Sequence, residues 1–136
     1  MINVLLQQWV LEEEWAMQPY LKDGYETKVI IFNAEAVRQY NAFFNISEED
    51  VVQPLYCAKL WPEFTLFQPF QKKEIKLRET QVTQIHDIKV NIHYLAQMCV
   101  IEQKKVRQFM KYVLELQIYK NKSKCITIRQ TFMEKF

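Results

Sequence analysis

Two histidines in this chain could act as a general base or bind a metal ion. His86 is expected in a connection between strands, and His93 on the polar face of a strand. Neither has a second type of ligand at the spacing of a metal site. We therefore interpret both as surface or hydrogen-bonded histidines, with catalysis as the alternative, and we predict no metal ion and no cofactor.

Three cysteines could supply a nucleophile, a metal ligand or a disulfide. Cys57, Cys99 and Cys125 are odd in number, far apart and without a CxxC spacing, so neither a disulfide framework nor a zinc site is indicated. Cys57 is expected on a buried helix, where an inert thiol is a better interpretation than a thiolate nucleophile. This use of cysteine predicts a reducing, cytoplasmic location.

Glycine is nearly absent, and this excludes several kinds of enzyme. Gly24 is the only glycine in the sequence. Phosphate-binding loops, nucleophile elbows and dinucleotide fingerprints all need glycine to bring the backbone close to the ligand. None of these sites is therefore expected.

The composition predicts one folded domain over residues 1–136, with no affinity for nucleic acid or membrane. Hydrophobic residues make up 49% of the chain and aromatic residues 14%, which is ample material for a core. Eighteen Lys and Arg against sixteen Asp and Glu give a net charge of +2, without the basic block typical of nucleic-acid binding. No run approaches the roughly 18 apolar residues of a spanning helix, and early glutamates, Glu12 to Glu14, argue against a signal peptide.

The elements that must position these residues are organised around residues 54–70, an apolar and aromatic stretch that we interpret as a buried helix. Pro54 suits the first helical position, and Pro62 is expected to end or kink the helix near Trp61. Apolar side chains recur at three- and four-residue steps most of the way round it, as in a helix enclosed by other structure. We predict that a sheet wraps this segment.

Strands are expected on both sides of this helix. Residues 25–32 form a strand that we place in the centre of the sheet, Asn33 caps a helix over residues 34–44, and residues 45–53 form a loop. Four strands follow, at residues 74–82, 88–101, 106–119 and 125–133, with a hairpin turn at residues 120–124. Residues 2–21 fit a short helix or an irregular strand equally well. The order predicts an α+β domain with a curled antiparallel sheet.

The second of these four strands has the clearest alternation. Residues 88–101 place an apolar side chain at every second position, with Lys89, Asn91, His93 and Gln97 among the residues between them. Such a pattern is typical of a long strand with one face on the core and the other in solvent. We therefore expect Gln97 to be exposed.

This order resembles the hot-dog fold, in which a curled sheet wraps around a central helix, and within it the MaoC-like dehydratase and hydratase group. The resemblance rests on a strand and helix, VIIFNAEAVRQYNAF, on a proline-containing approach to the central helix, VVQPLYCAKLWP, and on four long closing strands. It covers about residues 25–136. It implies a homodimer whose subunits join their sheets edge to edge, with the ligand cleft between them.

Active members of that group carry an Asp and a His around an approach that reads roughly YAxxxGDxNPxH, and this pair activates water for addition to an enoyl thioester. Tyr40 matches the tyrosine of the pattern. Gln53, Pro54 and Leu55 match its Asn, Pro and apolar positions. The resemblance therefore places the thioester-binding end of the fold at the start of the central helix.

Two departures from this pattern bear on activity. Tyr56 stands at the histidine position, and a free phenol, which titrates near pH 10, is a poor general base at neutral pH. The nearest carboxylate, Asp50, lies one residue further from Tyr56 than the pattern places it, without the glycine before it. Asp50 and Tyr56 are the candidate catalytic residues, but an exposed loop acid and a core tyrosine are the favoured interpretation.

The resemblance implies a ligand of the acyl-thioester class, carried by coenzyme A or by an acyl-carrier protein. The residues expected to contact it are Tyr40, Gln53, Pro54, Leu55, Cys57 and Trp61. A group of aromatic residues could line an acyl tunnel, although filling the core is the favoured role; it consists of Trp61, Phe64, Phe67 and Phe70. Paired lysines, such as Lys72 with Lys73, could meet the phosphates of coenzyme A or an acidic carrier, although most such lysines keep turns soluble.

Three functional hypotheses follow from the resemblance. The first is binding of an acyl thioester without standard hydratase activity. The second is a structural or regulatory partner whose cleft is occluded. The third, ranked last, is an active (R)-specific enoyl-thioester hydratase that uses Asp50.

Overall fold

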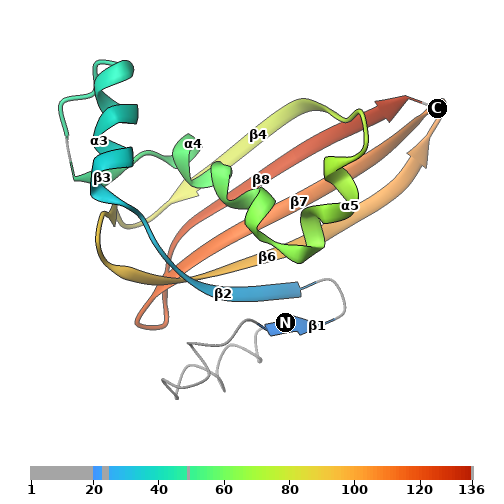
Figure 1. The fold of residues 1–136 in the computed structure, drawn as a ribbon. Coiled ribbons are helices and arrows are strands. Elements are labelled where there is room, and N and C mark those ends of the chain that lie inside the picture. The colour runs from blue at the N-terminus through green and yellow to red at the C-terminus, as the bar shows by residue number, and fades with distance from the viewer. Residues whose placement is uncertain (1–19, 23–24, 49, 136) are drawn as a thin grey trace.

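The computed structural model describes residues 20–22, 25–48 and 50–135, which form a curled antiparallel sheet with helices across one face (Figure 1). The strands are β1 (Tyr20–Lys22), β2 (Tyr25–Ile31), β3 (Val51–Val52), β4 (Lys76–Gln84), β5 (Ile88–Lys89), β6 (His93–Val106), β7 (Phe109–Lys120) and β8 (Ser123–Lys135). The helices are α3 (Ala34–Phe43), α4 (Pro54–Cys57) and α5 (Gln68–Gln71), with the 3-10 helices η1 (Ala58–Glu63) and η2 (Thr65–Phe67). The predicted α+β class is confirmed.

The main sheet has six strands in the order β1–β2–β6–β7–β8–β4, and every neighbouring pair is antiparallel. The strand predicted at residues 25–32 exists as β2, but its predicted central place is wrong, because β2 lies second from the edge, between β1 and β6. The other edge is β4, which within the described residues pairs only with β8. Of the segment 2–21, residues 2–19 lie outside the described residues, and its last two residues belong to β1.

Two hairpins join the long strands, and both are tighter than predicted. The turn between β7 and β8 is formed by Asn121 and Lys122, both at positive φ (51° and 70°), as a two-residue hairpin turn requires. The turn between β6 and β7 is formed around Arg107 (φ 58°), so the strand predicted to begin at residue 106 begins at Phe109. The regular strands therefore continue almost to the two turns.

Residues 88–101 do not form one strand. Ile88 and Lys89 pair with Val52 and Val51 in a separate two-stranded ribbon, β3–β5, which also interrupts the loop predicted at residues 45–53. Asn91 then takes a positive φ of 59°, which breaks the extended backbone before β6 begins. A periodicity of two cannot reveal this break, because the apolar residues on each side stay in phase.

The face of the sheet away from the helices is less exposed than the alternation predicts. Gln97 lies on it, as expected, but only 1% of its surface is accessible, and Cys99 beside it is also buried. Glu115, in the neighbouring strand, is buried and accepts two hydrogen bonds from the Arg129 guanidinium, at 2.9 and 2.7 Å. Polar residues therefore occupy a buried layer here rather than a solvated one.

Helix α3 begins where the sequence predicts. The Asn33 side chain accepts a hydrogen bond from the Ala36 amide at 2.9 Å, which satisfies one of the free N–H groups of the first turn. Val37 is fully buried, and Asn41 donates to the carbonyls of Glu48 and Val51 at 2.7 and 3.0 Å. These contacts fix the loop after α3, and with it the approach to α4.

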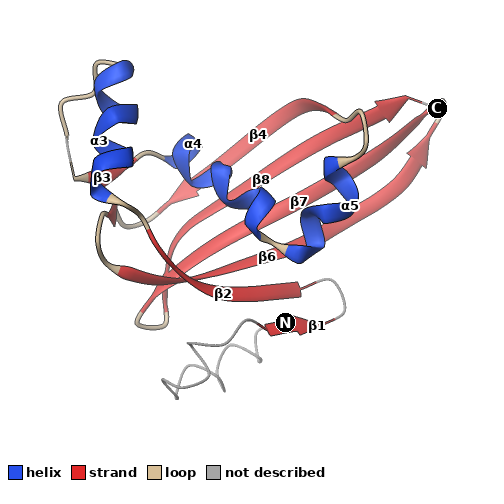
Figure 2. Ribbon diagram, in the orientation of Figure 1, coloured by secondary structure: helices blue, strands red, loops and turns tan. Residues whose placement is uncertain are grey.

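The central segment, residues 54–70, is helical but is not one helix. Pro54 occupies the first turn of α4 as predicted, but the chain continues as 3-10 helix from Ala58, and Phe64 is extended (φ −97°, ψ 137°). Pro62 lies inside η1. Because a proline has no backbone N–H, it cannot donate the hydrogen bond that would continue an α-helix at this position. Figure 2 shows the resulting chain of short helices across one face of the sheet.

This segment is anchored to the sheet by polar contacts as well as by its apolar residues. The Trp61 indole donates to Gln130 Oε1 on β8 at 2.7 Å, with both side chains buried. On β2, Glu26 accepts from the Leu66 amide at 2.8 Å. Leu55, by contrast, is 58% exposed, so the predicted burial of this helix does not extend to all of the first turn of α4.

Candidate functional site

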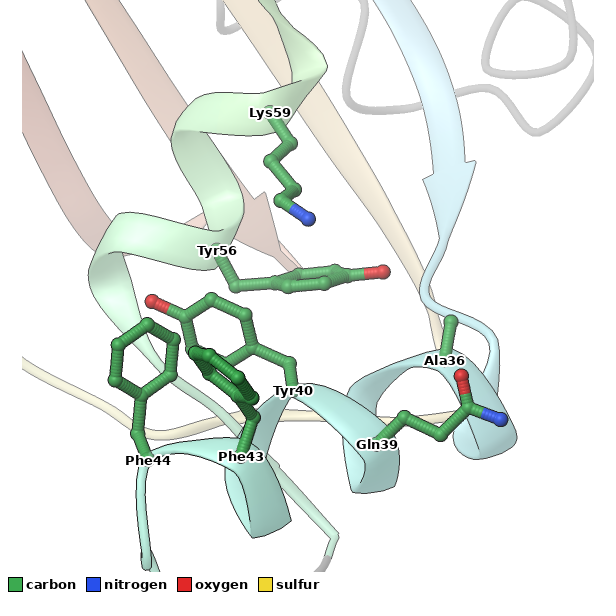
Figure 3. A pocket seen from close by; sticks show the side chains of 7 residues that line it. All are labelled: Ala36, Gln39, Tyr40, Phe43, Phe44, Tyr56 and Lys59. Carbon is green, nitrogen blue, oxygen red and sulfur yellow. The ribbon is translucent and has the colours of Figure 1, made fainter.

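A pocket of about 570 Å³ opens at the surface between α3 and α4. Aromatic rings and one lysine make up most of its lining, which consists of Ala36, Gln39, Tyr40, Phe43, Phe44, Tyr56 and Lys59. Figure 3 shows the Tyr56 ring between the Lys59 side chain and the Tyr40 ring. Two residues that the resemblance to the MaoC-like pattern singled out, Tyr40 and Tyr56, are therefore brought together.

The rings in the pocket hold one another in place. The centroids of Tyr40 and Tyr56 lie 5.1 Å apart with their planes at 74°, and those of Tyr40 and Phe44 lie 4.8 Å apart. Tyr56 also makes an edge contact with Phe32 of the core, at 6.1 Å. The two edge-to-face pairs, Tyr40 with Tyr56 and Tyr56 with Phe32, stabilise a fixed ring arrangement by about 0.5–1.5 kcal/mol each. The pocket wall is thus shaped in the folded protein before any ligand arrives.

Lys59 brings a positive charge to this aromatic wall. Its Nζ lies 5.0 Å from the centroid of Tyr56 and 5.6 Å from that of Tyr40, and the side chain is exposed. Two rings therefore share one cation, an interaction of about 0.5–1 kcal/mol at exposed sites. An anionic or carbonyl oxygen that entered the pocket would meet the ammonium group at its wall.

Asp50 does not line this pocket. Its carboxylate forms an ion pair with the Arg38 guanidinium at 2.8 Å, and the Asp50 side chain is 61% exposed. The structure thus separates the two candidate catalytic residues, with Asp50 turned to an exposed arginine and Tyr56 packed among aromatic rings.

The remaining predicted contact residues differ in where they lie. Leu55 is exposed on the first turn of α4, beside Gln53 and Pro54, which are partly buried. Cys57 and Trp61 lie in the core, with exposed fractions of 0% and 5%. Neither Cys57 nor Trp61 belongs to the lining of the pocket.

Cys57 has no access to a ligand in this structure, and its chemistry is suppressed. Burial raises the pKa of the Cys57 thiol to about 12, against the opposing effect of a hydrogen bond with the backbone. A thiol with such a pKa is protonated at neutral pH and is not a nucleophile. The interpretation of Cys57 as an inert core residue is therefore the one that the geometry supports.

The two histidines also lie away from the pocket. His86 is exposed between β4 and β5, and His93 is exposed at the start of β6. Across the described residues, 20–22, 25–48 and 50–135, no group of three His, Cys, Asp or Glu side chains could hold a metal ion. No helix in the same residues is long and apolar enough to cross a bilayer.

Sequence reasoning missed several residues of the pocket. Phe43 and Phe44, with exposed fractions of 79% and 54%, and Lys59 all belong to its lining. A pair of adjacent aromatic residues at the end of a polar helix was the available signal, because such residues are normally buried. Lys59 gave no such signal, since its position opposite two rings depends on how α4 and η1 lie against α3.

Comparison with solved structures identifies the architecture. The structure is similar to the (3R)-hydroxyacyl-ACP dehydratase HadBC of Mycobacterium tuberculosis, with a TM-score of 0.62 and 11% identity over 85% of this chain and 92% of that chain. It is also similar to a hypothetical thioesterase with coenzyme A from Streptococcus pneumoniae, with a TM-score of 0.57 and 9% identity over 85% and 81% of the two chains. At these identities the likeness concerns the fold, which is the hot-dog fold that the sequence predicted.

Comparison of sequences gives a narrower relationship. The chain is 42% identical over 118 residues to protein VraC of Staphylococcus epidermidis, a match that covers 87% of this chain and 98% of that protein. The model of the family described as uncharacterised conserved protein VraC matches residues 17–136. This chain, with its hot-dog fold and its aromatic pocket at the start of α4, therefore belongs to the VraC family.

Proposed function

We propose that this protein is a MaoC-like hot-dog protein that binds an acyl thioester in the pocket between α3 and α4, without standard hydratase turnover. The observation that carries the proposal is the pairing of Tyr40 and Tyr56 in that pocket, at 5.1 Å. These are the positions at which the MaoC-like pattern has its tyrosine and its histidine. This agreement in position is what supports a thioester site in the pocket.

The chemistry of the pocket suits the pantetheine end of such a ligand. Pantetheine carries amides, methyl groups and a thioester, and the aromatic faces of Tyr40 and Tyr56 can pack against its apolar parts. Lys59 can donate a hydrogen bond to a carbonyl oxygen or meet a phosphate, since its ammonium has three donors and no acid within ion-pair distance in the described residues. We therefore assign binding of the thioester ligand to the rings of Tyr40 and Tyr56 and to the ammonium group of Lys59.

Turnover lacks a suitable base. Asp50 is held by Arg38 outside the pocket lining, the Cys57 thiol is buried with its pKa raised to about 12, and both histidines lie elsewhere. Hydration needs a group within about 3 Å of the attacking water that accepts its proton at neutral pH. We therefore expect bound crotonyl-CoA to remain unhydrated, and Asp50→Asn to change neither binding nor this outcome.

The length of the acyl group is limited by the filled core. The space beneath α4 and η1 is occupied by Leu60, Trp61 and Phe64, with exposed fractions of 7%, 5% and 0%. A long acyl chain would have to displace these side chains or lie in solvent. The protein should therefore prefer short acyl groups, such as acetyl and butyryl.

Calorimetric titration with acetyl-CoA, butyryl-CoA and palmitoyl-CoA tests this proposal. We expect the two short thioesters to bind, and Tyr56→Ala to weaken them at least about tenfold, because a buried aromatic contact contributes about 1.5–3 kcal/mol. Tyr25→Ala is the matched control, since Tyr25 is 38% exposed on β2 and outside the pocket. Absence of binding at every chain length would refute the proposal and favour the alternative of a structural or regulatory partner, which the filled core also suits.

We further propose that two copies pair through β4. The outer edge of β4 has no neighbouring strand in the described sheet, and eight of its nine residues are exposed, with Leu77 at 51% and Val82 at 41%. Such an edge is a template for pairing with another strand. Sedimentation should show a dimer that Val82→Lys weakens, whereas a monomer at all concentrations would contradict this part of the proposal.

The free cysteines support a proposal for the cellular location. Cys57, Cys99 and Cys125 are all free and buried. Unpaired thiols of this kind are usual in a reducing compartment. We therefore place the protein in the cytoplasm, where acyl thioesters of coenzyme A and of carrier proteins are also available.

A further inference from the structure

A second cleft lies at the other end of the helical segment, where α5 leads into β4 and where β7 begins and β8 ends. Its volume is about 860 Å³. Three stretches of chain that are distant in sequence form it: residues 69–78, Phe109, and residues 133–135. It shares no lining residue with the aromatic pocket.

The charges in this cleft are strongly unbalanced. Five cations line it, namely Lys72, Lys73, Lys76, Arg78 and Lys135, against two acids, Glu74 and Glu134. The chain as a whole has a net charge of only +2, so the cleft is far more basic than the average of the molecule. Concave surfaces lined by one sign of charge concentrate ligands of the other sign.

One of the two acids is already engaged. Glu134 accepts a hydrogen bond from the Tyr112 hydroxyl at 2.6 Å, and its carboxylate lies 4.0 Å from Lys73 Nζ. Lys72, Lys76, Arg78 and Lys135 are exposed and form no ion pair within the described residues. Four cations without an ion pair therefore face the cleft, together with one acid, Glu74.

The local backbone and the cleft floor indicate what kind of anion would fit. The register between β4 and β8 shifts between Leu77 and Glu79, so Arg78 is the extra residue of a bulge, a feature that re-aims a side chain at a sheet edge. An arginine guanidinium matches the oxygens of a phosphate in a bidentate way. Pro69, Phe109 and Met133 add apolar surface within the same lining, against which a flat ring could pack.

We propose that this basic cleft is a second ligand site, which takes a phosphate-bearing molecule of nucleotide size. Its phosphates would meet Lys72, Lys76, Arg78 and Lys135, and its ring would lie against Phe109. The volume is within the range of small-ligand sites, roughly 300–1,000 Å³. A concave site of this size favours a small molecule over an extended polyanion.

Calorimetric titration with ATP, inorganic pyrophosphate and adenosine tests the proposal. We expect ATP and pyrophosphate to bind, more weakly as salt is added, and adenosine not to bind. The double variant Lys76→Glu, Arg78→Glu should weaken ATP at least about tenfold, because it removes and reverses charge at the phosphate position. Both residues lie on β4, the edge proposed to pair two copies, so sedimentation, circular dichroism and the melting temperature together establish that the variant is folded and keeps the oligomeric state of the parent.

The matched control is Lys89→Glu, Lys122→Glu, which makes the same change of net charge at exposed positions on β5 and in the β7–β8 turn. It should keep ATP affinity within about twofold, since exposed charges at a distance are largely screened by salt. Equal weakening by the two double variants would mean attraction to net charge alone, and would overturn the site. Failure of ATP and pyrophosphate to bind would also overturn the proposed site. The same holds if anionic vesicles or polyglutamate bind while ATP and pyrophosphate do not.

The inference is independent of the acyl-thioester proposal. Tyr56 lies in the aromatic pocket and not in the basic cleft, so Tyr56→Ala should leave ATP affinity unchanged. Loss of ATP binding in Tyr56→Ala would show that the nucleotide occupies the aromatic pocket, and would refute a separate site. The two proposals can therefore fail separately.

Discussion

Replacing Trp61 by Phe tests how the segment that carries the pocket is held on the sheet. The indole N–H donates to Gln130 Oε1 at 2.7 Å, and Gln130 Nε2 in turn donates to Thr80 Oγ1 at 3.0 Å. Both Trp61 and Gln130 are 5% exposed. In Trp61→Phe the carbonyl oxygen of Gln130 would stay buried without its donor.

The expected cost follows from these contacts. An unsatisfied buried acceptor costs about 1–3 kcal/mol, and the smaller ring leaves a space that adds on the order of 1 kcal/mol. We therefore expect Trp61→Phe to lower the free energy of unfolding by roughly 2–4 kcal/mol. Gln130→Leu should lower the free energy of unfolding by a similar amount, because it leaves the Trp61 indole N–H without an acceptor.

Equilibrium unfolding in urea measures the single variants and the double variant Trp61→Phe, Gln130→Leu. Since each single change strands a polar group that the double change removes, the double variant should lose less stability than the sum of the two. A loss below about 0.5 kcal/mol for Trp61→Phe, or strict additivity in the cycle, would refute the structural role assigned to this hydrogen bond. An unchanged m-value is the control that the denatured state has not altered.

Three further predictions concern the frame of the site. Asn33→Ala should lower the free energy of unfolding by about 0.5–2 kcal/mol, since the Asn33 side chain caps α3, and no change in the urea midpoint would contradict this. Iodoacetamide should leave Cys57 unmodified in the native protein and label it in urea, as mass spectrometry can determine, because burial raises the pKa of this thiol to about 12; rapid native labelling would mean that the core opens. Burial likewise raises the pKa of Cys99 and of Tyr119 to about 12. The folded state holds these protons more tightly than the unfolded chain, so their contribution to stability is complete below about pH 9 and is lost as the pH rises through about 12. The urea midpoint should therefore fall in alkaline solution, and a midpoint that rises there would contradict the assignment.

The elements that were predicted correctly have local signals. Asn33 caps α3 because its own side chain bonds to an amide three residues on, and Pro54 starts α4 because its fixed φ is already helical. The β-branched run of β2 and the alternation of β7 and β8 are also visible without knowledge of the partner strands. Local chemistry alone therefore predicts most of the element order.

What was missed depends on pairing between distant residues. Val51 and Val52 form β3 only because Lys89 and Ile88 lie opposite them, and Gln97 is buried because of what surrounds its face of the sheet. The position of β2 beside the edge is a property of the strand order, which no single segment encodes. Such features need the tertiary arrangement, which overrides local preference.

In the candidate site, too, some residues were predicted from the sequence and others depend on contacts between distant segments. Tyr40 and Tyr56 were predicted from the resemblance, and they do meet in one pocket. Asp50 was paired with Tyr56 as the carboxylate nearest to the spacing of the MaoC-like pattern, but Arg38, twelve residues before it, engages its carboxylate. In the basic cleft, only Lys72 and Lys73 were named from the sequence, as possible phosphate contacts. The cleft as a whole could not be predicted, since it joins Arg78, Phe109 and Lys135 from three separate stretches.

The most direct test of acyl-thioester binding is a site-resolved one, in which butyryl-CoA is titrated into ¹⁵N-labelled protein and followed by two-dimensional NMR. The account predicts saturable shifts at the amides of the pocket, in residues 36–44 and 55–59, with smaller effects in Tyr56→Ala. Saturable shifts confined to other parts of the chain, or none at all, would contradict it.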